Sequence, residues 1–114
     1  MERRKQPRIM IDDLSVDIND GKGFYQGRVT DISKTGLCME DLPKHINTEA
    51  KRLTVVVSGK GGHFRLIVCP KWYTQGNADK IIGGEILTSS WMWEDFVSRL
   101  EPLSDTIDFG EIYI

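Results

Sequence analysis

The sequence predicts a mainly β fold: a six-stranded antiparallel β-barrel followed by one C-terminal α-helix. Apolar and polar residues alternate over several short runs, which is the period of a half-buried strand. The turn Gly59–Gly62 separates two runs rich in β-branched residues and therefore indicates a hairpin. A helical stripe of apolar residues occurs once, between residues 93 and 100.

Three strands are expected in the first part of the chain. The first covers residues 14–19, with residues 9–12 extending it backwards, and a turn rich in glycine and asparagine follows it. The second covers Phe24–Ile32 and the third covers Gly36–Met39. Residues 43–51 have the composition of a polar loop without a core pattern.

Three more strands are expected in the second part, at residues 53–58, 63–72 and 80–87. Pro70 predicts an edge or a bulge in the second of these, because proline cannot donate a hydrogen bond to a ladder. Gly83 and Gly84 predict a bulge or a close backbone approach, as a barrel corner requires.

The expected helix begins after Ser89 or Ser90, whose hydroxyl can cap it, and ends before Pro102. Its apolar stripe predicts that one face is buried against an open end of the barrel. We expect its two tryptophans to be buried there. The stripe consists of Trp93, Phe96, Val97 and Leu100.

At 114 residues the chain is expected to form one domain, and 39% hydrophobic with 28% charged residues is ordinary usage for a soluble protein. No apolar run approaches the ~20 residues of a membrane span, so we expect a cytoplasmic protein. Cys38 and Cys69 lie in predicted strands with apolar neighbours, which favours free buried thiols. The chain contains no spacing typical of a zinc site or a catalytic nucleophile, so we expect no metal, no cofactor and no enzyme activity.

Charge divides the chain unevenly. Residues 1–8 carry four cations and one carboxylate, a net charge of +3, which leaves −5 on residues 9–114. A basic arm on an acidic body favours one local anion site and argues against an extended nucleic-acid track. We therefore divide the chain into a basic ligand-binding arm at 1–8, a barrel with its helix at 9–102 and a tail at 103–114.

Two polar stretches carry the side chains best suited to bind a ligand. The arm contains arginines beside Pro7, which denies this segment a helix and leaves the guanidinium groups on an extended or turning chain. The second stretch ends the strand at Ile32, and its Asp31 is expected to share a face with Tyr25, Gly27 and Val29. If strand pairing persists, Ser33 points from the same face as Asp31. A carboxylate beside guanidinium groups suits a ligand with anionic phosphates and a base that offers N–H donors.

The pattern Arg4-x-x-x-Arg8 followed by Asp31-x-Ser33-x-x-Gly36 resembles the two-part signature of the PilZ domain, the bacterial receptor module for cyclic dimeric GMP (cyclic di-GMP). The two parts stand in the family's order with one strand length between them. The resemblance extends over roughly residues 3–100 and does not cover the last dozen.

The resemblance implies a split barrel of the PilZ type whose arm closes over the ligand against the end of the second strand. It implies that the arginines grip guanine edges or phosphates and that Asp31 accepts a hydrogen bond from guanine N1–H or N2–H. Arg3 precedes the signature by one residue and predicts two ligand molecules per chain, bound as an intercalated pair. The ligand-binding residues are then Arg3, Arg4, Arg8, Asp31, Ser33 and Gly36.

Because the chain includes no output domain, the resemblance also implies an adaptor that passes its signal to an unknown effector protein, for example in motility or exopolysaccharide machinery. A small-barrel binder of single-stranded nucleic acid remains a second hypothesis, against which the acidic body argues. A PilZ-fold adaptor without ligand affinity is a third. The acidic tail ends in β-like residues suited to adding an edge strand in this chain or in another, which leaves a homodimer open.

Overall fold

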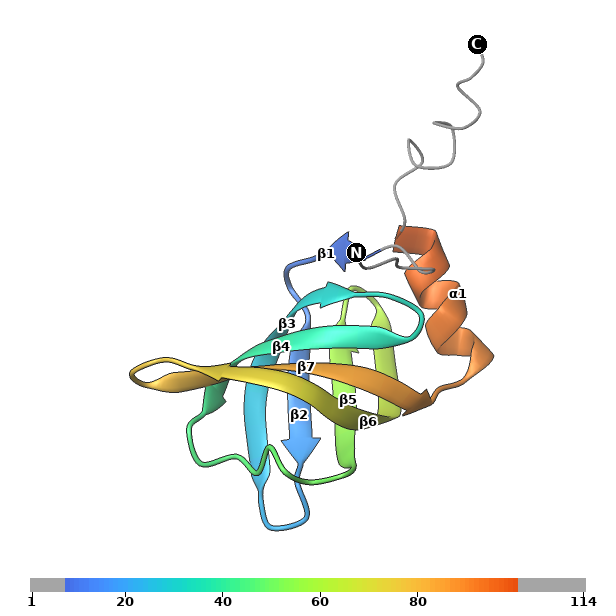
Figure 1. Ribbon diagram of the computed structural model, residues 1–114. Coiled ribbons are helices and arrows are strands. Elements are labelled where there is room, and N and C mark those ends of the chain that lie inside the picture. Colours follow the sequence, from blue (N-terminus) through green and yellow to red (C-terminus); the bar gives the residue numbers. More distant parts are fainter. Residues whose placement is uncertain (1–7, 101–114) are drawn as a thin grey trace, which may run out of the picture.

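A computed structural model describes residues 8–100 as a β-barrel with a helix at its C-terminal end (Figure 1). The elements in chain order are β1 (Ile9–Met10), β2 (Ser15–Asn19), β3 (Phe24–Ile32), β4 (Gly36–Pro43), β5 (Leu53–Gly59), β6 (Gly62–Gln75), β7 (Asp79–Thr88) and α1 (Trp91–Leu100). Within these residues, no helix combines the length and the apolar character that crossing a membrane requires.

The six long strands form a closed antiparallel barrel, as the sequence predicted. Their hydrogen-bonded order is β3-β2-β5-β6-β7-β4, and β4 pairs again with β3 to close the ring. The short strand β1 stands apart from this ring, because it pairs with β3 and with no other strand of the described chain. Residues 9–12 therefore do not extend β2 backwards, since the chain bends between Ile11 and Leu14.

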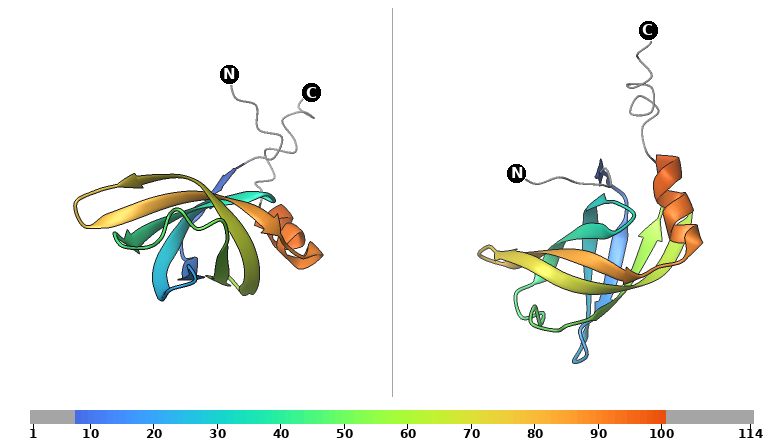
Figure 2. Two further views of the ribbon diagram at one scale, coloured as in Figure 1. Left: turned by 60° about the horizontal axis from the view of Figure 1, so that its bottom comes forward. Right: turned by 45° about the vertical axis from the view of Figure 1, so that its right-hand side comes forward.

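The barrel is filled by the inward side chains of all six long strands, and α1 adds to the same core from one side (Figure 2). Trp93, Phe96 and Val97 of the helix are buried, and the ring of Phe64 in β6 lies 5.4 Å from the ring of Trp93, measured between centroids. Trp91 is 74% exposed, so the expectation that both tryptophans of the helix are buried is wrong. Positions two apart on a helix point in nearly opposite directions, so only one of the pair can face the barrel.

The segment after β4 is not the coreless loop that its composition predicted. β4 continues to Pro43, and Ile46 in the following loop is buried in the core. The backbone carbonyl of Ile46 accepts a hydrogen bond from Lys80 Nζ at 3.3 Å, and a carboxylate oxygen of Asp20 accepts one from Asn47 N at 2.9 Å. A single apolar residue among polar ones leaves no period in the sequence, which is why this anchor was missed.

Two β-bulges decide which side chains reach the outer face of the barrel. Thr30 is an extra residue in β3, because Val29 and Asp31 face consecutive residues of β4. The sequence predicted that Asp31 shares a face with Val29, which is buried inside the barrel. The bulge breaks this alternation, so Asp31 points outwards instead. The second bulge lies between Pro70 and Trp72 in β6, as Pro70 predicted, and it turns Trp72 to the outer face.

Candidate functional site

The structure brings Arg8 of the arm against Asp31. Arg8 immediately precedes β1, and β1 pairs with the end of β3 so that Met10 lies opposite Asp31. Arg8 Nη1 is 3.4 Å from Asp31 Oδ1, with 39% of the arginine side chain and 14% of the aspartate side chain exposed. The pairing of β1 with β3 therefore joins the two halves of the sequence signature in space.

Ser33 and Gly36 form the turn from β3 to β4, directly after Asp31. Ser33 N donates to the Gly36 carbonyl at 2.9 Å, and Thr35 N donates to Ser33 Oγ at 3.3 Å. A Cβ on Gly36 would lie 3.0 Å from the carbonyl oxygen of Gly84, so glycine lets β4 approach β7 closely. Because β3 ends at Ile32, the condition under which Asp31 and Ser33 would share a strand face is not met.

Ser33 is 6% exposed, and its hydroxyl is already engaged with the turn, donating weakly to the Gly36 carbonyl at 3.5 Å. The turn residues therefore fix the backbone beside Asp31. Arg3 and Arg4, the other two arginines of the predicted site, lie outside the described residues. Of the six predicted site residues, the structure places Arg8, Asp31, Ser33 and Gly36.

An aromatic side chain stands on the same row of the outer surface as Asp31. Across the strands, Asp31 pairs with Cys38 of β4, Cys38 with Gly83 of β7, and Gly83 with Trp72 of β6. A Cβ on Gly83 would overlap the indole of Trp72, so the ring lies against the bare backbone of that glycine. Trp72 is 42% exposed and offers an aromatic surface about three strand spacings, ~14 Å, from Asp31.

The sequence did not identify Trp72 as an aromatic residue on the row of Asp31. Two signals in the sequence could have identified Trp72. Pro70 predicts a bulge that changes the face to which the following side chains point, and Gly83 leaves space for the Trp72 ring. Neither signal specifies a partner, because the pairing of β6 with β7 sets which glycine lies opposite.

Cys38 is part of this row, between Asp31 and Gly83. Its neighbours Leu37 and Met39 point into the core, so the Cys38 side chain points outwards, yet it is only 6% exposed. Burial raises the pKa of the Cys38 thiol, and the carboxylates of Asp31 and Glu40 add to this effect against the opposing influence of Thr30 and Arg8. Cys38 therefore contributes an uncharged, buried thiol to the surface between Asp31 and Trp72. Cys38 and Cys69 are both free thiols, as predicted, although Cys69 is only partly buried.

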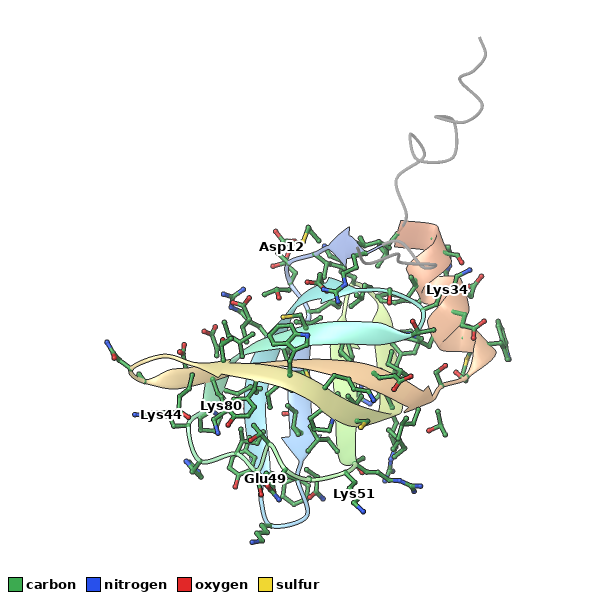
Figure 3. The ribbon with its side chains drawn as sticks, viewed as in Figure 1. Asp12, Lys34, Lys44, Glu49, Lys51 and Lys80 are labelled. Atoms are coloured by element: carbon green, nitrogen blue, oxygen red, sulfur yellow. The ribbon has the colours of Figure 1, made fainter. Side chains whose placement is uncertain are left out.

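Several of the charged side chains labelled in Figure 3 lie on the loops and turns of the barrel. In Figure 3, Asp12 lies just beyond β1, and Lys34 lies in the turn between β3 and β4 on the side of the barrel that carries α1. Lys44, Glu49 and Lys51 lie toward the other end, on the loop that follows β4. Lys34 follows Ser33 directly and places a cation in the turn, three residues after Asp31 in the chain.

Comparison with known proteins gives matches only among solved structures: no family model and no curated protein sequence matches the chain. The inhibitor of motility MotI/DgrA of Bacillus subtilis aligns with a TM-score of 0.69 and 12% identity, over 85% of this chain and 48% of that protein. MrkH of K. pneumonia, solved with cyclic di-GMP, has a TM-score of 0.69 and 16% identity, over 100% of this chain and 57% of that protein.

The PilZ domain of YcgR from Escherichia coli, also solved with cyclic di-GMP, has a TM-score of 0.69 and 15% identity, over 96% of this chain and 98% of that domain. The chain spans about half the length of MotI and MrkH. At such low identity, similarity of structure establishes the fold. The chain has a PilZ-type fold, in agreement with the resemblance seen in its motifs.

Proposed function

We propose that this PilZ-fold protein is a receptor for cyclic di-GMP. The observation that carries the proposal is the 3.4 Å contact between Arg8 Nη1 and Asp31 Oδ1, which joins two motifs that are distant in sequence. Similar structures solved with cyclic di-GMP support the same ligand. The proposed binding residues are Arg3, Arg4, Arg8, Asp31, Ser33 and Gly36.

The chemistry of the placed residues fits a guanine nucleotide with two phosphates. A carboxylate such as Asp31 accepts hydrogen bonds from guanine N1–H and N2–H, and a guanidinium group binds guanine O6 and N7 or a phosphate through paired donors. In this proposal Asp31 orients one guanine, the arm covers the phosphates, and the exposed ring of Trp72 supplies a surface on which a purine stacks.

Binding alone is the proposed activity, and the output is a change in the surface around the arm. An effector protein that contacts this surface would read whether the ligand is present. We propose that the receptor works in the cytoplasm as such an adaptor.

Calorimetric titration of the purified protein with cyclic di-GMP tests the proposal, with cyclic di-AMP as the matched control ligand. Adenine lacks the N1–H and N2–H donors that Asp31 is proposed to accept, so only the guanine ligand should release or absorb heat. A flat trace with cyclic di-GMP at high micromolar concentration would rule the receptor function out. If a single-stranded oligonucleotide binds with a steep salt dependence instead, the protein is a nucleic-acid binder, because many phosphate contacts release many counterions.

The same titration measures the number of ligands per chain. Arg3 gives the arm one more guanidinium group than the two-arginine signature contains, and a pair of intercalated ligands presents more phosphates and guanine edges for it to bind. We propose two ligands for the wild type and one for Arg3→Leu. If the wild type and Arg3→Leu both bind one ligand per chain, the proposed ligand pair is wrong, but the proposed receptor function is unaffected.

A further inference from the structure

The second half of β6 has an edge that no described strand covers. β6 pairs with β5 from Gly62 to Val68 and with β7 from Ile67 to Gln75. From Cys69 to Gln75, β7 therefore lies on one side of β6, and no strand of residues 8–100 lies on the other. This part of β6 and the start of β7 form a hairpin that projects from the barrel on the side away from α1 (Figures 1 and 2). Such an edge is a template for another strand.

The turn of this hairpin shows which backbone groups point toward the open edge. Gly76 N donates to the Asp79 carbonyl at 2.9 Å, so these two residues form a hydrogen-bonded pair. Hydrogen-bonded and non-hydrogen-bonded pairs alternate along an antiparallel ladder. The pairs that Gln75 and Tyr73 make with β7 are therefore of the second kind. Their N–H and C=O groups point away from β7, toward the open edge.

Two exposed aromatic rings flank the open edge, one on each face of the hairpin. Trp72 is 42% exposed and Tyr73 is 52% exposed. Successive side chains of a strand point to opposite faces, so a strand added at this edge would cover part of both rings. Backbone hydrogen bonds to the added strand would then be supplemented by burial of aromatic surface.

A buried lysine lies beside the edge. Lys80 is 7% exposed, and its Nζ lies 5.2 Å from the centroid of the Tyr73 ring. The same Nζ donates to the Ile46 carbonyl at 3.3 Å. Among residues 8–100, no carboxylate forms an ion pair with Lys80. A buried cation without a counterion favours a carboxylate nearby.

Two further lysines lie near the same edge. Lys71 is part of the edge, and its Nζ lies 3.3 Å from Glu85 Oε1. Lys44 comes directly after β4, whose last residue pairs with Asp79 of β7, and Figure 3 shows Lys44 and Lys80 below the projecting hairpin. Pairing with a second copy of the chain would bring like charges together, whereas carboxylates on an added strand would be attracted. The charges therefore favour an acidic strand over a second copy.

We propose that the edge Cys69–Gln75 binds an extended acidic segment of a partner protein, which adds to the sheet as a further strand. Its backbone pairs with Tyr73 and Gln75, and its carboxylates lie beside the lysines. Such a partner would be the effector of the proposed receptor, and in that respect the inference rests on the proposed function. The pairing itself does not require cyclic di-GMP.

NMR titration of the isotope-labelled protein without cyclic di-GMP tests the pairing. The probe is the synthetic peptide acetyl-Thr-Val-Glu-Val-Glu-Val-Thr-amide, and the matched control peptide has lysine in place of both glutamates. The acidic peptide should shift the amide resonances of Tyr73 and Gln75 with a Kd of about 1 mM or lower. It should also slow the hydrogen exchange of these two amides, which should be fast in the free protein. The lysine peptide should do neither.

Three variants test the contributions of the backbone and of the charge. Gln75→Pro removes an edge donor that β7 does not use, so it should weaken binding of the acidic peptide about fivefold while leaving the hairpin intact. Lys80→Met removes the cation at similar side-chain volume and should weaken binding about three- to tenfold. Lys22→Met is the matched control, because Lys22 is an exposed lysine in the turn between β2 and β3, and it should bind as the wild type does.

Several outcomes would overturn the proposal. No shift with the acidic peptide at about 2 mM, or equal binding of both peptides, would do so. Slow exchange of Tyr73 and Gln75 in the free protein that becomes fast on dilution would show a second copy at the edge. Slow exchange at every concentration would show that the chain covers its own edge. If the acidic peptide binds and cyclic di-GMP does not, the docking edge stands and the receptor function is wrong.

Discussion

Replacing Arg8 by alanine should weaken ligand binding strongly while leaving the fold almost unchanged. Arg8 contacts Asp31 at 3.4 Å, but 39% of its side chain is exposed, so the pair stabilises the folded state by at most about 1 kcal/mol. For a domain of this size, that corresponds to a fall in Tm of no more than about 8 °C. In the complex the same guanidinium group would bind a phosphate or a guanine edge in a partly desolvated site, and its loss should cost about 2 kcal/mol, or thirtyfold in Kd.

Calorimetry and thermal unfolding of the same samples separate these two effects. Arg52→Ala is the matched control, because Arg52 is also exposed but lies in the loop before β5, away from Asp31. The control should leave both Kd and Tm unchanged. If Arg8→Ala lowers Tm by much more than 8 °C and leaves Kd unchanged, the arm is a structural element and the reasoning from the Arg8–Asp31 contact is wrong.

Three further variants or treatments test the surroundings of the site. Gly83→Ala should displace the Trp72 ring, which has room to move because it is 42% exposed. We expect ligand binding to weaken about tenfold, with a change in Tm of only a few degrees. An unchanged Kd would exclude stacking of the ligand on Trp72. Burial raises the pKa of Asp20, but backbone N–H groups that donate to its carboxylate outweigh burial and lower the pKa below its usual 3.8. Because the pKa in the folded state is lowered, this carboxylate stabilises the fold above about pH 4 and the stabilisation is lost as the pH falls through the folded pKa. Asp20→Asn should therefore lower the free energy of unfolding at pH 7 by about 1–3 kcal/mol and make this free energy less dependent on acid pH. Denaturant titration at several pH values measures both effects. An unchanged pH dependence would show that the hydrogen bonds to Asp20 contribute little to stability. Cys38 should react with iodoacetamide more slowly than Cys69, because burial raises the pKa of the Cys38 thiol, and mass spectrometry that finds Cys38 modified first would contradict the packing under the site.

The sequence by itself predicted those features that depend only on residues close together in the chain. The β5–β6 hairpin follows from a glycine-rich turn between β-branched runs, and the helix follows from one apolar stripe. The bulge after Pro70 also follows from local chemistry, because a missing N–H disrupts a ladder wherever it occurs. The two-part motif likewise identified four residues that the structure places at one end of the barrel, around the start of β1 and the turn after β3.

Tertiary structure alone decided where the side chains of the site point. The bulge at Thr30 arises from the register of β3 against β4, and it separated Asp31 from the face of Val29 that it was predicted to share. Pairing of β1 with β3 set the contact with Arg8, and pairing of β7 with β6 placed Trp72 on the same row. A side chain in a strand changes face with each one-residue shift in register, and register depends on a partner far away in the sequence, so no local pattern could have determined it.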